Sequence, residues 1–187
     1  MITQSRTSPP LASTPPDEIS PGAPNSSATR FTHIESPVGE LLVTADAAGA
    51  LTRLLFPGHS GAARAEWTRD ESPFTELRRQ LDAYFAAELE DFDLELAPSG
   101  TPFQLQVWSA LRAIPYGATT SYGEIARAVG QPEAARAVGG ANNRNPIAIV
   151  IPCHRVIGAS GSLTGYGGGL DRKRQLLALE SGISPLL

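Results

Sequence analysis

The amino-acid sequence predicts an α+β protein of two units: a small mixed unit of strands and one helix, then a mostly helical unit. Three strand-like segments at short spacing open the first unit, whereas apolar residues recur at helical intervals in the second. The charge changes where the pattern does. Residues 1–100 have a net charge of −8 and residues 101–187 a net charge of +4. Any contact with a polyanion is therefore expected in the second unit.

Composition limits both the location and the chemistry of the protein. The 187 residues contain no apolar run of the roughly 18–20 residues that a membrane-spanning helix needs. The N-terminal segment lacks the apolar stretch of a secretory signal, so we expect a cytoplasmic protein without membrane contact. A single cysteine excludes an intramolecular disulfide, and because His33 and His59 are isolated, no metal site is expected.

The first unit is expected over residues 31–100, after a disordered tail over residues 1–30. The tail contains six prolines and no hydrophobic periodicity. Strand-like segments at 31–36, 40–46 and 50–56 are separated by short turns, which favours an antiparallel meander. A helix follows near 73–89, where six apolar residues share one stripe: Phe74, Leu77, Leu81, Tyr84, Phe85 and Leu89. Alternating apolar residues at 92, 94 and 96 predict a returning strand.

The second unit, residues 101–187, begins with an apolar stripe that predicts a helix at 103–114. Ser121 and Glu124 form a capping-box pattern that opens a helix ending near Gly130. Pro132 is suited to the first position of the next helix, which runs through Asn143. Two short helices with a tight junction predict a helix-turn-helix, although packed helix pairs also occur without DNA binding.

The second helix of this pair carries little side-chain bulk. Gly139 and Gly140 lie inside it, each costing about 1 kcal/mol relative to alanine, and four of its other residues are alanines. Only Arg136 projects far. The helix either crosses close to a neighbouring element or presents a low-relief face to another surface.

The chemically distinctive stretch surrounds Cys153. The apolar, β-branched residues at 147–151 predict a short buried strand, which Pro152 ends. Cys153 and His154 can act together only if the chain turns there, and a helical turn with exposed N–H groups would favour a thiolate. An isolated cysteine is also commonly an inert buried residue.

Glu180 makes the functional interpretation stronger. It shares a helical stripe with Leu176 and Leu177 near the C-terminal end of a helix, where a carboxylate is disfavoured by about 0.3–1 kcal/mol. An imidazole N–H is a fitting partner, so Cys153, His154 and Glu180 can serve as nucleophile, base and orienting group. The alternatives are a solvent-exposed Glu180, or a thiol hydrolase that uses the same three residues.

Three segments resemble the signature of the O6-alkylguanine-DNA alkyltransferases, also called methylated-DNA–protein-cysteine methyltransferases: IPCHRV at 151–156, RAVGGA at 136–141 and Asn145-Pro146. The resemblance extends from about Phe103 to Glu180 and includes GYGGG at 165–169. It implies a ribonuclease-H-like N-terminal domain at 31–100 and a DNA-binding, catalytic domain with the helix-turn-helix at 101–187. The tail has no counterpart in the family.

The resemblance also implies roles for single residues. Cys153 attacks the alkyl carbon on guanine O6 and keeps the group irreversibly, so each molecule reacts once. His154 removes the thiol proton through a water molecule, and Glu180 holds the imidazole. Asn145 hydrogen-bonds near the thiol, and Tyr122 supplies a proton to the departing guanine.

Pocket and DNA contacts are implied in the same way. Tyr166, Val156 and the loop at 165–169 line the pocket, and Gly167 stands where some relatives carry a serine. The damaged base is flipped out through the minor groove, and Arg136 fills its place in the stack. The other implied DNA contacts are Ala135, Ala137, Gly139, Gly123, Ala159 and Gln104.

The expected partner is double-stranded DNA containing O6-alkylguanine, with O4-alkylthymine left open as a further substrate. The family implies no cofactor and no metal, and we expect a monomer. Two non-enzymatic alternatives fit less well. Alkyltransferase-like proteins that only flag damage replace the acceptor cysteine, which this chain retains. A helix-turn-helix regulator fits poorly with a net charge of −4 and a nearly bare second helix.

Overall fold

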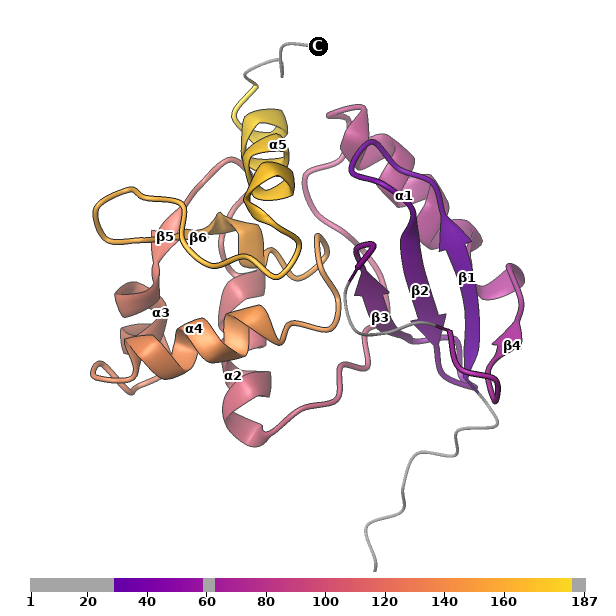
Figure 1. The fold of residues 1–187 in the computed structure, drawn as a ribbon, viewed down its shortest axis with the longest axis horizontal. Coiled ribbons are helices and arrows are strands. Elements are labelled where there is room, and N and C mark those ends of the chain that lie inside the picture. Colours follow the sequence, from indigo (N-terminus) through magenta and orange to yellow (C-terminus); the bar gives the residue numbers. More distant parts are fainter. Residues whose placement is uncertain (1–28, 59–62, 183–187) are drawn as a thin grey trace, which may run out of the picture.

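The computed structural model describes residues 29–58 and 63–182, so nearly all of the predicted tail at 1–30 lies outside the described residues. A sheet with one helix against its face lies beside a unit made mostly of helices (Figure 1). No helix within the described ranges is long and apolar enough to cross a bilayer.

The predicted meander is present in the first unit. Its strands are β1 (Arg30–Ile34), β2 (Leu41–Ala45) and β3 (Leu51–Leu55), paired antiparallel in sequence order. A two-residue strand, β4 (Thr68–Arg69), pairs parallel with β1 and gives the order β3-β2-β1-β4. β4 was not predicted from the sequence, because two residues carry no measurable periodicity.

The predicted helix at 73–89 is shorter than its apolar stripe. A 3-10 turn, η2 (Ser72–Phe74), leads into α1 (Thr75–Phe85). The chain leaves the helix after Phe85, and Ala87 adopts a left-handed φ of 59°. Leu77, Leu81 and Tyr84 are buried in the core. Leu89 lies beyond the helix and still packs against the core. The apolar stripe therefore predicted which residues are buried, but not where the helix ends.

The strand expected around 92–96 is wrong as a strand. The segment is extended, but Leu96 alone forms a bridge, parallel to Leu51. Two backbone hydrogen bonds form this bridge, from Leu51 N to the Glu95 oxygen and from Ala97 N to the Leu51 oxygen, both 2.8 Å. Alternating apolar residues indicate that one face of a segment is buried. An extended segment can bury one face without pairing with a neighbouring strand, so this pattern does not establish a strand.

The second unit contains the four expected helices: α2 (Pro102–Arg112), α3 (Tyr122–Ala128), α4 (Ala135–Asn143) and α5 (Leu170–Glu180). Between them lie a 3-10 turn, η3 (Cys153–Arg155), and the parallel pair β5 (Thr120–Ser121) and β6 (Val156–Ile157). The capping box of Ser121 and Glu124 is confirmed. α4 begins three residues later than expected, because Pro132 and Glu133 form a turn after α3.

The strand expected at 147–151 is a sequence of tight turns instead. Ile147 bridges Leu54 of β3, and then Ile149 adopts a φ of 70°, which is uncommon for a β-branched residue. The adjacent Leu54 N donates to the Pro146 oxygen at 2.8 Å, and Ala148 N donates to the Leu54 oxygen at 2.9 Å. The loop therefore covers the outer edge of β3, and its apolar side chains are buried by packing between the two units.

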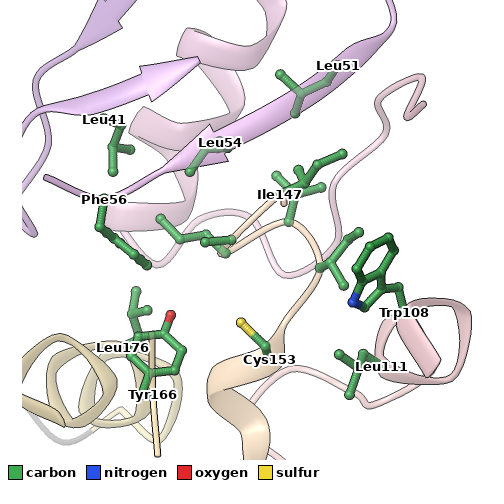
Figure 2. Close-up of a cluster of buried hydrophobic side chains, with 14 of the residues drawn as sticks. Leu41, Leu51, Leu54, Phe56, Trp108, Leu111, Ile147, Cys153, Tyr166 and Leu176 are labelled. Atoms are coloured by element: carbon green, nitrogen blue, oxygen red, sulfur yellow. The ribbon is translucent and has the colours of Figure 1, made fainter. Parts of the chain in front are cut away.

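One hydrophobic core spans both units. Figure 2 shows Leu41, Leu51, Leu54 and Phe56 of the sheet unit opposite side chains of the helical unit. The opposing residues include Trp108, Leu111, Ile147, Cys153, Tyr166 and Leu176. The indole nitrogen of Trp108 donates to the Ala141 oxygen at 3.0 Å, which ties α2 to α4. The cysteine thus sits where the sheet and the helices meet.

The two leucines of α2 provide a matched test of this core. Leu111 is 0% exposed and Leu105 is 41% exposed. We expect Leu111→Ala to lower the free energy of unfolding by about 2–5 kcal/mol, because it leaves a cavity in packed surroundings. Leu105→Ala should change it by less than about 0.5 kcal/mol. Guanidinium unfolding measures both, and equal losses would contradict this placement of the core.

Candidate active site

Cys153 lies at the start of η3, where Pro152 reverses the chain. The Cys153 N–H donates to the Ile151 oxygen at 2.8 Å across Pro152, and the side chain is only 5% exposed. The helical turn that the sequence analysis required is therefore present. It lets His154 point toward α5 while Cys153 faces the junction of the two units.

The resting state of the sulfur differs from the expectation of a favoured thiolate. Burial raises the pKa of the Cys153 thiol, and the opposing effects of Asn145, Tyr166 and the Lys173 charge do not compensate. A single short turn cannot offset the desolvation of a buried anion. Because the thiol is protonated at rest, the site needs a base to make it a nucleophile.

His154 and Glu180 are paired as the sequence analysis expected. His154 Nε2 lies 2.7 Å from Glu180 Oε1, and both side chains are buried. Burial alone would raise the pKa of Glu180, but hydrogen bonds from His154, Arg155 and Tyr84 outweigh it and lower this pKa to about 2. The ionised carboxylate can only accept, so Nε2 carries the hydrogen.

The other ring nitrogen is the one suited to act as a base. His154 Nδ1 is buried and has no hydrogen-bond partner among the residues that the structure describes. Burial lowers the pKa of His154, more than Glu180 raises it, so the imidazole is neutral at rest. A neutral ring whose Nε2 holds the hydrogen leaves the Nδ1 lone pair available for the thiol proton.

Two residues that sequence reasoning missed complete the surroundings of Glu180. Arg155 donates from Nε to Oε2 at 2.8 Å and from Nη2 to Oε1 at 3.0 Å. Tyr84 of α1 donates its hydroxyl to Oε1 at 2.7 Å. The Gly117 N–H adds a longer contact to Oε2 at 3.3 Å. Arg155 follows His154 in the sequence and could have been proposed, but Tyr84 fits the apolar stripe of α1 and gave no signal.

Asn145 braces the turns that precede Cys153. Its side-chain nitrogen donates to the Ile151 oxygen at 2.7 Å, and its oxygen accepts from the Ile147 N–H at 3.0 Å. Asn142, which sequence reasoning missed, donates to the Cys153 oxygen at 3.3 Å. Both amides therefore hold backbone groups around the cysteine.

A narrow cavity opens at the sulfur. Its lining includes Cys153, Asn145, Tyr166 and Gly167, together with Leu55, Phe56, Asn142, Asn143, Ala148 and Gly168, and its volume is about 10 Å³. That space suits a single water molecule. A Cβ at Gly168 would lie 2.6 Å from the Phe56 ring, so glycine is required for this close approach.

Lys173, also missed, fastens the loop that follows η3. Its Nζ donates to the Val156 oxygen at 2.6 Å and to the Thr164 oxygen at 3.2 Å, and the side chain is 0% exposed. Val156, an expected pocket residue, is itself buried at the start of β6. Lys173, Leu176 and Glu180 share one face of α5, and a lysine within that stripe was the available signal.

Tyr122 begins α3 and its hydroxyl donates to the Thr164 oxygen at 3.3 Å. Burial raises the pKa of Tyr122, and the nearby Cys153 raises it further against the effect of Thr164. The phenol therefore keeps its proton close to the thiol. A Cβ at Gly139 of α4 would lie 3.8 Å from the Tyr122 ring, an ordinary van der Waals distance, so this position of α4 packs next to the ring without requiring a glycine.

The structure brings only some of the expected DNA-contacting residues together. Gln104, Arg136 and Ala137 line one groove of about 640 Å³ between α2 and α4, with Arg136 and Ala137 exposed. The Gln104 side chain also caps α2 by accepting from the Thr101 N–H at 2.9 Å, which sequence reasoning missed. The remaining expected residues are Ala135 and Gly139, half-buried on α4, Gly123, half-buried on α3, and Ala159, exposed after β6.

Comparison with known proteins identifies the family from both halves of the chain. Residues 102–182 match the DNA-binding domain of 6-O-methylguanine DNA methyltransferase, and residues 29–98 match its ribonuclease-like domain. The chain belongs to this methyltransferase family. The second match confirms the ribonuclease-like first unit that the resemblance implied.

Named relatives of the methyltransferase are similar over most of their length. The chain is 57% identical over 153 residues to a methylated-DNA–protein-cysteine methyltransferase of Mycolicibacterium paratuberculosis, covering 81% of this chain and 92% of the relative. It is 55% identical over 147 residues to the Methanosarcina acetivorans protein of that name, covering 78% and 94%. The solved structure of Mycobacterium tuberculosis OGT in complex with DNA is 54% identical, covers 83% and 95%, and has a TM-score of 0.78.

Acid stability of the methyltransferase should depend on Glu180. A carboxylate whose pKa is lowered from 4.5 to about 2 by folding stabilises the fold above pH 4.5 and loses that contribution as the pH falls toward 2. At neutral pH, Glu180→Gln leaves the Arg155 charge without its partner, so we expect a loss of about 3–5 kcal/mol in unfolding free energy. The deficit should shrink between pH 4.5 and 2.

The matched control is Glu76→Gln, because the pKa of Glu76 is also lowered to about 2, mainly by its hydrogen bond with Arg79. Glu76 and Arg79 are exposed on α1, where an ion pair contributes little. Denaturant unfolding across pH measures both variants. A Glu180→Gln deficit that stays constant down to pH 2 would contradict the argument.

Proposed function

We propose that this chain repairs double-stranded DNA by transferring the alkyl group of O6-alkylguanine to its own Cys153, as a methylated-DNA–protein-cysteine methyltransferase that reacts once. The observation that carries the proposal is the pairing of Glu180 with His154 Nε2, which leaves the Nδ1 lone pair available on the residue that follows the only cysteine of the chain. Relatives named for this activity support the assignment.

The proposed reaction is an in-line displacement at carbon. His154 takes the thiol proton at Nδ1, through a water molecule, and Glu180 stabilises the imidazolium across the Nε2 hydrogen bond. The Cys153 sulfur then forms a bond to the alkyl carbon while the bond from that carbon to guanine O6 breaks. The electron pair of the broken bond leaves with guanine, and the sulfur becomes a thioether that no step reverses.

Tyr122 is the proposed proton donor to the departing guanine. A guanine anion is a poor leaving group, so protonation in the transition state accelerates its departure. The raised pKa of Tyr122 keeps the phenol protonated at neutral pH, and its position near Cys153 supports this role. Asn145 is proposed to hold the turn, and Tyr166, Val156 and Gly167 to surround the base.

The proposal requires the damaged base to leave the helix. A cavity of about 10 Å³ is far too small for a purine, so its lining must move apart when the base enters. Flipping costs a few kcal/mol of stacking and pairing. We assign α4 to the minor groove, where Ala135, Ala137 and Gly139 allow close approach and Arg136 fills the vacated place in the stack.

Three further parts of the proposal concern the whole protein. Residues 31–100 and 101–187 are taken as its two domains, with Gly123, Ala159 and Gln104 of the second as additional DNA contacts. The protein is taken to act in the cytoplasm. It is taken to act as a monomer without a cofactor.

Intact-protein mass spectrometry tests the acceptor. After exposure to an oligonucleotide containing O6-methylguanine, we expect the mass of the protein to rise by one methylene unit, with the change localised to Cys153. Cys153→Ala should show no gain and should retain binding to the damaged duplex, because the substitution leaves α4 unchanged. A mass gain in that variant would reject Cys153 as the acceptor.

The stacking role of Arg136 is tested by comparing two substrates. Arg136→Ala should slow transfer from duplex DNA by on the order of tenfold or more, because the extruded state loses the side chain that fills the gap. Transfer from free O6-benzylguanine should be unchanged, since no base is extruded. Arg79→Ala on α1 removes an exposed arginine from the other unit and serves as the control. Equal losses on both substrates would contradict the stacking role.

A further inference from the structure

Tyr84 connects the first unit to the hydrogen-bonded pair of His154 and Glu180 in the second unit. It lies in α1, is 0% exposed, and donates its hydroxyl to Glu180 Oε1 at 2.7 Å. The same oxygen lies 2.7 Å from His154 Nε2. Figure 1 shows α1 and α5 at the same end of the molecule, approaching each other from the two units.

The direction of this hydrogen bond is fixed by its partners. The ionised carboxylate of Glu180 can only accept, so the Tyr84 hydroxyl must donate. Burial, followed by the negative charge of Glu180, raises the pKa of Tyr84, so the phenol stays protonated wherever the protein is folded. Tyr84 therefore withdraws charge from Oε1 at every working pH.

We propose that Tyr84 is a positioning residue for alkyl transfer, which orients the Glu180 carboxylate and limits the negative charge that it offers to His154. The inference rests on the proposed function for its kinetic consequence. Oε1 accepts from Tyr84, His154 and Arg155, and the three donors share its charge. Without the tyrosine hydroxyl, the Nε2 hydrogen bond strengthens and the imidazolium becomes easier to form.

Among the groups that face Glu180 and His154, Tyr84 is the one that α1 contributes. Glu180 is also faced by Arg155 and Tyr116, while His154 is faced by Glu180, Arg155 and Lys173. The cations Arg155 and Lys173 disfavour protonation of His154, and a substitution in α1 leaves both in place. Loss of the Tyr84 hydroxyl therefore acts in one direction, toward a higher His154 pKa.

Tyr84→Phe tests the proposal, with Tyr116→Phe as its matched control. The two rings are edge-to-face with centroids 6.1 Å apart, so each variant loses one hydroxyl from the same aromatic cluster. The Tyr116 hydroxyl is buried and has no hydrogen-bond partner in the described parts of the chain. Removing it leaves the three donors to Glu180 Oε1 intact.

Two measurements follow the effect. NMR of protein labelled with ¹⁵N-histidine reports the Nε2–H proton of His154, one of three histidines in the chain. The pH dependence of single-turnover transfer from O6-benzylguanine reports the protonation of the base. A third sample carries a ring-fluorinated tyrosine at position 84, a stronger donor that keeps the hydroxyl and tests the same bond if Tyr84→Phe does not fold.

In Tyr84→Phe, we expect the His154 Nε2–H resonance to move downfield, because its hydrogen bond strengthens. The acid limb of the rate profile should move to higher pH by about half a unit. This is a fraction of the roughly 1–3 pKa units that a neighbouring full charge produces. The fluorinated tyrosine should move both readouts the opposite way, and Tyr116→Phe should move neither.

A lowered unfolding temperature in Tyr84→Phe with both readouts unchanged would overturn the proposal and leave Tyr84 a structural residue. If the unsubstituted protein transfers no alkyl group, the proposed function fails instead. The Nε2–H resonance still decides whether Tyr84 controls the hydrogen bond between His154 and Glu180, so the two failures are distinguishable.

Discussion

The buried carboxylate of Glu180 is the group on which the arrangement of the site depends. It ends α5, where the helix dipole disfavours a negative charge, and it is 5% exposed. An unpaired buried charge would cost several kcal/mol. Donors from three separate places compensate it: the loop at Gly117, the turn η3 and helix α1. The hydrogen bonds around Glu180, including the one from His154, therefore form only when these elements have packed together.

This arrangement separates reactivity from exposure. The Cys153 thiol is buried and protonated at rest, so it is protected from incidental reaction with solutes. The neutral His154 holds its hydrogen toward Glu180 and its lone pair at Nδ1. Such a thiol becomes nucleophilic only when a substrate reaches it and the base removes its proton. For a protein proposed to react once, that protection conserves the single reactive group.

The sheet unit contributes directly to the site. The loop at 147–151 follows the edge of β3 through hydrogen bonds at Leu54, and it leads straight into Pro152 and Cys153. Leu55 and Phe56 form part of the cavity wall, and Tyr84 reaches Glu180 from α1. The two units share one core, so the N-terminal unit fixes the turn that presents the cysteine (Figure 2).

Local patterns in the sequence determined what depends on neighbours along the chain. The meander, the capping box at Ser121 and Glu124, the helix ending at Glu180 and the candidate group Cys153, His154 and Glu180 follow from periodicity, turn residues and the cost of a carboxylate at a helix end. Only the tertiary structure decided that the apolar segments 92–96 and 147–151 are not strands, because a buried strand and a buried loop are both rich in apolar residues. It also decided that Tyr84 and Lys173 surround the site, since contacts between distant elements leave no periodic trace in the chain.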